Sequence, residues 1–245
     1  MIKAILFDLD DTLLENDIHN FMNHYFALLG RHASVFMEAQ RFIAELLICT
    51  RAMMADTDTS ISNRDAFWGT FAERNEVDDI AELEAYFEQF YRDIFPQLRQ
   101  QTRQRASAAR LVQRCLDQGL QVVVATNPVF PPVAIEHRLA WAGVPVDAYP
   151  FALVTNYSNM HATKPHPAYY QEILQKIGCE PEAALMVGDS WENDIVPASG
   201  LGLSTYWIAD EDEDLPDTAV SIIAQGSLER LEDLVVSGWL TELEL

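Results

Sequence analysis

The sequence contains few cysteines, little positive charge and no long uncharged apolar run. Its three cysteines, Cys49, Cys115 and Cys179, are too widely spaced for a disulfide framework or a metal-binding cysteine motif. We therefore expect each to be a small apolar residue of the core. No uncharged stretch reaches the roughly 18 residues that a membrane-spanning helix needs. The sequence thus predicts no membrane segment.

Positive charge is scarce along the whole chain. It has 16 Lys and Arg against 38 Asp and Glu, a formal net charge of -22. Such a chain repels nucleic acid and anionic membrane surfaces, and no basic stripe counters this repulsion. We therefore expect neither nucleic acid nor a membrane as a partner. No leader segment is recognised before the first apolar run, so we expect a cytoplasmic protein.

The apolar pattern predicts an α/β fold. Residues 2–7 form a nearly continuous apolar run, typical of a strand buried on both faces of a parallel sheet. From about residue 105, short β-branched runs alternate with helical patterns, which indicates βαβ units. With 245 residues, 49% of them hydrophobic, the chain can form one α/β core and a small second domain. We expect a Rossmann-like parallel sheet sandwiched by helices.

Residues 13 to about 104 have a helical pattern without any strand signal. Apolar residues recur at helical spacing in four segments, of which the first ends at Gly30 and the second begins near Val35. We predict an all-α helical bundle over residues 16–104, inserted into a core formed by residues 1–15 and 105–245. The aromatic side chains of the bundle are expected to form its own core, with a few facing a pocket against the sheet.

Polar residues follow several predicted strands or lie in the loops between them. Because carboxyl ends of parallel strands meet at one sheet edge, where ligands bind, these residues are expected to converge. A carboxylate can attack phosphorus, and a divalent cation held by oxygen ligands relieves repulsion between carboxylates. A lysine and a threonine can stabilise charge on phosphoryl oxygens. The residues in question are Asp8, Asp10, Thr126, Asn127, Lys164 and Asp189.

Four ordered motifs carry a family resemblance. They are Asp8-Leu9-Asp10-Asp11-Thr12, then Thr126, then Lys164-Pro165, and finally Gly188-Asp189-Ser190-Trp191-Glu192-Asn193-Asp194. In this order they resemble the motifs of the haloacid dehalogenase-like (HAD) hydrolase superfamily over essentially the whole chain. The helical insert lies where many members carry a cap domain. The resemblance implies a Mg²⁺-dependent phosphatase that hydrolyses a small phosphorylated metabolite through an aspartyl-phosphate.

The resemblance also implies a role for each acidic residue. Asp8 is the nucleophile and binds Mg²⁺ through one carboxylate oxygen. Asp10 protonates the leaving alkoxide and later deprotonates water, and its backbone carbonyl is a Mg²⁺ ligand. Asp189 completes the protein ligands.

The remaining matching residues are implied to bind or support the phosphoryl group. Thr126, Asn127 and Lys164 are expected to hold it. Asp194 and Thr12 are implied to support the residues that contact the metal and the phosphoryl group, without contacting either themselves. Asp194 would orient Lys164 or a metal-bound water.

Several alternatives stay open. Dehalogenases of the superfamily lack the second Asp of the first motif, so Asp10 favours phosphate esters over carbon–halogen bonds. Phosphonate hydrolysis in the family uses a cap lysine, and residues 15–95 contain no lysine. A phosphomutase shares all four motifs. A receiver-like or non-catalytic phospho-binding protein is a further alternative, although a receiver is about half as long. The identity of the substrate and the oligomeric state are not predicted.

Overall fold

The computed structural model describes residues 1–216 and 219–242. Its central sheet has six parallel strands in the order β5-β4-β1-β6-β7-β8. β1 lies between β4 and β6, with Phe7 opposite both Val124 and Val187. The carboxyl ends of these three strands therefore reach the same edge. The strands are β1 (Ala4–Phe7), β4 (Gln121–Val124), β5 (Leu153–Val154), β6 (Ala184–Gly188), β7 (Ser204–Ile208) and β8 (Ala224–Gly226).

Helices cover both faces of this sheet. Successive side chains of a strand point to opposite faces, so Ile5 and Phe7 of β1 enter one apolar cluster and Ala4 and Leu6 enter another. The first cluster lies under α5 (Ala106–Asp117), α6 (Pro132–Trp141) and α9 (Leu228–Ser237), and the second under α7 (Pro167–Ile177) and α8 (Val196–Gly200). The predicted α/β sandwich is confirmed.

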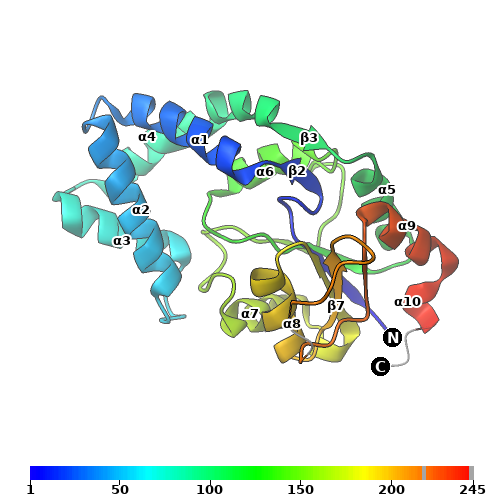
Figure 1. Ribbon diagram of the computed structural model, residues 1–245. Coiled ribbons are helices and arrows are strands. Elements are labelled where there is room, and N and C mark those ends of the chain that lie inside the picture. Colours follow the sequence, from blue (N-terminus) through cyan, green and yellow to red (C-terminus); the bar gives the residue numbers. More distant parts are fainter. Residues whose placement is uncertain (217–218, 243–245) are drawn as a thin grey trace.

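A helical insert after β1 is also confirmed, whereas its bounds at residues 16 and 104 stay a prediction. Four helices lie to one side of the sheet, at the left of Figure 1, and we call them the helical insert. Side chains of Asp17, Ser62 and Asp79 cap three of them by accepting a hydrogen bond from a first-turn backbone N–H. The insert consists of α1 (Ile18–Ala33), α2 (Ala39–Ala55), α3 (Asn63–Asn75) and α4 (Ile80–Asp93).

Short elements complete the described chain. They are the 3₁₀ turns η1 (Phe95–Gln101) and η2 (Pro181–Ala183), the π-helical turn η3 (Trp191–Ile195) and the short helix α10 (Trp239–Glu242). Within residues 1–216 and 219–242, every helix is too short or too polar to span a bilayer.

Two helix boundaries predicted in the insert are wrong. α1 does not end at Gly30 but continues to Ala33. A Cβ added at Gly30 would lie 3.3 Å from the Cβ of Ala39, so this glycine lets α1 and α2 approach closely. Val35 precedes α2 instead of belonging to it, and 75% of its surface is exposed.

The prediction that residues 13–104 contain no strand is also wrong. β2 (Leu14–Asn16) and β3 (Thr102–Gln104) pair antiparallel where the chain enters and leaves the insert. Strands of three residues are too short to show an alternating pattern. Their pairing joins segments about ninety positions apart. β8 also has only three residues, and the sequence pattern predicts no strand there.

Candidate active site

Polar residues follow three neighbouring strands at one edge of the sheet. Asp8 follows β1, Thr126 lies two residues beyond β4, and Asp189 follows β6. The backbone N–H of Asp8 donates to the carbonyl of Val187 at 2.9 Å, so Asp8 and Asp189 leave the sheet side by side. Open parallel sheets bind ligands at this edge.

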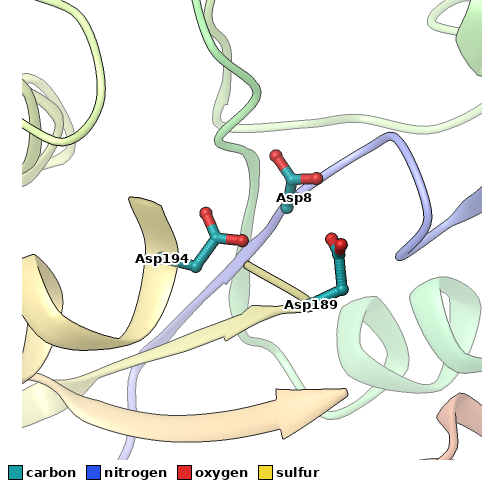
Figure 2. Close-up of side chains that lie close together, drawn as sticks. All are labelled: Asp8, Asp189 and Asp194. Atoms are coloured by element: carbon teal, nitrogen blue, oxygen red, sulfur yellow. The ribbon is translucent and has the colours of Figure 1, made fainter. Parts of the chain in front are cut away.

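The carboxylates of Asp8, Asp189 and Asp194 form one compact group, which we call the acidic group. One oxygen from each lies within 4.8 Å of the other two. Figure 2 shows the three side chains around a shared space. Asp8 is 9% exposed and Asp194 is 1% exposed, so both charges are largely withdrawn from water. An uncompensated group of this kind is costly to bury.

Lys164 provides part of the compensation. Its ammonium donates to Asp8 Oδ1 and to Asp194 Oδ1, each at 2.6 Å. Burial alone would lower the pKa of Lys164, but the Asp194 and Asp8 carboxylates raise this pKa well above its ordinary value. Lys164 is therefore a fixed positive charge within the acidic group.

The acidic group nevertheless keeps an excess of negative charge. Three carboxylates and one ammonium carry a formal net charge of -2. Burial raises the pKa of Asp8 well above its usual range, and burial together with Asp194 and Asp11 raises the pKa of Asp189 to about 6. A divalent cation would offset this excess, and oxygen ligands are those that Mg²⁺ prefers. The donor set therefore fits a hard divalent cation.

The carboxylates of Asp194 and Asp189 differ in the hydrogen bonds that they already accept from the protein. Asp194 Oδ1 accepts from Lys164, and Oδ2 accepts from the backbone N–H of Ser190 at 3.1 Å. Within the described part of the chain, Asp189 receives one side-chain hydrogen bond, from the Thr12 hydroxyl at 3.2 Å. Asp194 is thus engaged in holding Lys164, whereas Asp189 is the more available ligand.

The second carboxylate of the first motif lies apart from the acidic group. Asp10 Oδ2 accepts from Arg138 Nη1 at 2.5 Å, and Oδ1 accepts from Asn16 Nδ2 at 3.0 Å. Arg138 comes from α6 and is 2% exposed, and its guanidinium lies 4.7 Å from the centroid of the Phe130 ring. Asp10 is therefore fixed by a buried cation rather than by Lys164.

Neither Arg138 nor Asn16 is predicted from the sequence. A signal exists for Arg138, which lies on the same helical face as the buried Ala134 and Ile135. A cation on an apolar helical face indicates a buried partner, because an unpaired charge is costly there. No comparable signal marks Asn16, which belongs to a three-residue strand.

The predicted phosphate-binding segments meet beside the acidic group. Asn127 Oδ1 accepts from the backbone N–H of Lys164 at 3.3 Å. The carbonyl of Thr126 accepts from the hydroxyls of Thr155 and Tyr169 at 2.7 and 2.8 Å. These bonds connect the loop after β4 with the segment that carries Lys164 and with α7. The structure thus brings Thr126, Asn127 and Lys164 to the edge where Asp8 lies.

Comparison with known proteins identifies relatives of this chain. A family model described as haloacid dehalogenase-like hydrolase matches residues 2–202. Pyrophosphatase PpaX of Bacillus cereus (strain Q1) is 29% identical over 207 residues, which cover 83% of this chain and 82% of that relative. PpaX of Bacillus cereus (strain AH820) is 34% identical over 94 residues, and this match spans 38% of the chain and 41% of the relative's own length.

Solved structures share the fold. A HAD phosphatase from Thermococcus onnurineus has a TM-score of 0.57 and 21% identity, covering 96% of this chain and 98% of that chain. The HAD-hydrolase YfnB from Bacillus subtilis, bound to magnesium, has a TM-score of 0.53 and 19% identity at the same coverage. Identities this low show the fold alone. The family model covers most of the chain, and on that basis the chain belongs to the haloacid dehalogenase-like hydrolases.

Proposed function

We propose that this chain is a Mg²⁺-dependent phosphatase that hydrolyses a small phosphomonoester. The observation that carries the proposal is the Lys164 ammonium, held at 2.6 Å from both Asp8 and Asp194 beside Asp189. This arrangement offers a nucleophile and a cation for phosphoryl oxygens at one point. The pyrophosphatase relatives support a phosphate substrate, and the magnesium in YfnB supports the choice of ion.

The proposed Mg²⁺ site uses Asp8, Asp189 and the backbone carbonyl of Asp10. Asp194 is excluded from the ligands because protein donors already engage both of its oxygens. Thr12 supports Asp189 through its hydroxyl. When bound, the ion neutralises charge on the carboxylates and the phosphoryl oxygens.

The first proposed step transfers the phosphoryl group to Asp8. An Asp8 carboxylate oxygen attacks phosphorus, the bond from phosphorus to the ester oxygen breaks, and an aspartyl-phosphate forms. Lys164, Thr126 and Asn127 hold the phosphoryl oxygens and stabilise their charge. Protonated Asp10 gives its proton to the leaving alkoxide, which departs as the alcohol.

The second proposed step regenerates the enzyme. Asp10, now ionised, takes a proton from a water molecule as that water attacks phosphorus. The bond between phosphorus and Asp8 breaks, inorganic phosphate leaves, and the Asp8 carboxylate is restored. Arg138 and Asn16 hold the Asp10 carboxylate while it is ionised.

The proposal extends to the organisation of the chain. Residues 1–15 and 105–245 form the catalytic core, and residues 16–104 form a cap over it. We also propose that the protein is cytoplasmic and that it binds neither nucleic acid nor a membrane.

The test is phosphate release from an aryl phosphate by the purified full-length chain. EDTA should abolish turnover and Mg²⁺ should restore it. Asp8→Asn should lower kcat by about 10⁴-fold or more, because it removes the nucleophile. In the unmodified protein, mass spectrometry after rapid acid quenching should find one added phosphoryl group on the peptide that contains Asp8.

Asp11→Asn is the matched control. Asp11 has a left-handed backbone conformation that Asn tolerates (φ 56°), and its Oδ1 accepts from the backbone N–H of Asn16, as an Asn side chain also can. This variant should keep most of the activity. Turnover that survives EDTA, or survives Asp8→Asn, contradicts the mechanism. Halide release from a 2-haloacid without phosphate release would identify a dehalogenase instead.

A further inference from the structure

A cavity of about 740 Å³ lies between the helical insert and the loops that follow β4 and β5. All four helices of the insert line it, together with residues 129–133 after β4 and residues 157–158 after β5. Ligand pockets typically measure roughly 300–1,000 Å³. This cavity therefore suits a molecule much larger than a phosphate group.

Aromatic rings dominate the wall of the cavity. Ten of its 23 lining residues are Phe, Tyr or Trp, and they come from both the insert and the core loops. Six of them, each from a different helix or loop, are Tyr25, Phe42, Trp68, Phe87, Phe130 and Tyr157. Such a wall favours an apolar, ring-containing ligand, because aromatic groups stack or pack edge-to-face.

The charges on the wall disfavour an anionic ligand body. Among the described residues that line the cavity, the acids are Glu84, Glu88 and Glu136, and the single cation is Arg92. Arg92 is already paired with Glu88 at 2.5 Å. Glu84 is likewise paired with Arg64, whose Nε lies 2.6 Å from Glu84 Oε1. Among the described lining residues, the wall therefore offers no free cation to a carboxylate or a second phosphate.

The polar atoms of Trp68 and Tyr157 are engaged within the protein. Trp68 is 7% exposed, and its buried indole nitrogen lies against the Tyr157 hydroxyl rather than open to the cavity. The Tyr157 hydroxyl donates to Glu84 at 3.1 Å. These two residues therefore offer a ligand the apolar parts of their rings.

Asp10 connects the cavity to the acidic group. Phe130 belongs to the wall, the Arg138 guanidinium lies over its ring, and Arg138 donates to the Asp10 carboxylate. In the proposed function, Asp10 protonates the leaving oxygen. The leaving alcohol therefore lies on the Asp10 side of the phosphoryl group. Residues of the acidic group do not line the cavity, and Arg138 with Phe130 marks where Asp10 and the cavity wall adjoin.

We propose that the substrate is the phosphomonoester of an alcohol with a bulky, uncharged aromatic body. This substrate class rests on the proposed function: the aromatic body occupies the cavity, and its ester oxygen faces Asp10. The chemistry is the two-step hydrolysis described above, with the alcohol as the first product.

The test compares three esters that share a primary alkoxide leaving group. They are ethyl phosphate, 2-(2-naphthyl)ethyl phosphate and phosphoglycolate. The naphthyl ester should exceed ethyl phosphate in kcat/KM by about thirtyfold or more, since it buries an aromatic body in the cavity. Phosphoglycolate should react no faster than ethyl phosphate because its carboxylate meets no free cation among the described residues of the wall.

A charge reversal in the wall provides a second measurement. Glu88 is exposed, so Glu88→Lys should fold normally, and it should raise the ratio of kcat/KM for phosphoglycolate to that for ethyl phosphate about fivefold. Glu73→Lys is the matched control, since Glu73 is an exposed acid of α3 outside the cavity wall, and it should change neither ester.

Direct binding separates this inference from the proposed function. Calorimetric titration of the Asp8→Asn protein with 2-(2-naphthyl)ethanol should show saturable binding. If all three esters react at similar rates through Asp8 and the alcohol does not bind, the substrate class is wrong and the phosphatase stands. If none of the esters reacts although the alcohol binds, the phosphatase proposal fails and the substrate assignment fails with it.

Discussion

At the scale of single residues, the acidic group depends on a glycine that leaves room for Asp194. A Cβ added at Gly188 would lie 2.2 Å from Asp194 Oδ2. The Asp194 side chain cannot give way easily, because Lys164 and the Ser190 backbone N–H hold its two oxygens. The spacing between glycine and the last Asp of the fourth motif is therefore a packing requirement as well as a chemical one.

Gly188→Ala should consequently destabilise the protein and lower its activity. Overpacking of this kind costs about 1–3 kcal/mol. If Asp194 is displaced, Lys164 loses one of its two carboxylate partners. Thermal unfolding should show a Tm lower by several degrees. Gly69→Ala is the control: Gly69 lies exposed within α3 with nothing within 4 Å of the added Cβ, so this change should stabilise slightly. Equal Tm shifts in both variants would contradict the packing argument.

At the scale of elements, α5 and α9 are joined by an ion cluster on one face of the sheet. Glu232 of α9 is 9% exposed and accepts from Arg110 at 2.7 Å and from Arg114 at 3.2 Å. Hydrogen bonds from Arg110, and then from Arg114, lower the pKa of Glu232 despite its burial. Below these charges, Leu231 and Val235 of α9 enter the apolar cluster.

This lowered pKa predicts a pH dependence of stability. A carboxylate whose pKa is lower in the folded state stabilises the fold above its unfolded pKa of roughly 4.3, and this stabilisation is lost as the pH falls through the folded pKa. Glu232→Gln should therefore lower the free energy of unfolding at pH 7 by about 1 kcal/mol, and the difference should shrink below about pH 4. Asp233→Asn, an exposed neighbour, should have almost no effect in the same denaturant titrations.

At the scale of the whole molecule, the helical insert is fixed to the core by the beginning of α3. The buried Asn63 amide donates to the carbonyls of Pro128 and Ala162 at 3.3 and 3.1 Å. The backbone N–H of Asn63 donates to Met160 at 2.8 Å. One side chain of the insert thus contacts both the loop after Thr126 and the segment before Lys164.

Asn63→Ala should loosen this contact. It leaves two carbonyls without their donor, at a cost of about 1–3 kcal/mol. Hydrogen exchange should become faster in residues 127–130 and 160–164, where the insert touches the core. Asn75→Ala is the control, because the Asn75 amide donates to Phe71 within the same helix. Unchanged exchange in the core segments after Asn63→Ala would show that the insert is held elsewhere.

The sequence by itself determined the class of the fold and the position of the candidate site. Burial on two faces requires a continuous apolar run, and residues 2–7 show one that stops at Asp8. Because parallel strands end at a common edge, the residues after β1, β4 and β6 had to meet. Both inferences need only local patterns and one topological rule, which explains why a single sequence is enough for them.

Tertiary structure alone decided how the side chains at that edge are paired. Lys164 reaches Asp8 across 156 positions of the chain, and Arg138 reaches Asp10 across 128. The acidic group consequently contains Asp194 and leaves the Asp10 carboxylate outside it. Tertiary structure alone also decided the pairing of β2 with β3. It decided the cavity as well, which aromatic residues of the insert line together with two core loops. Pairing and cavities depend on which distant segments pack together, and no local periodicity encodes that.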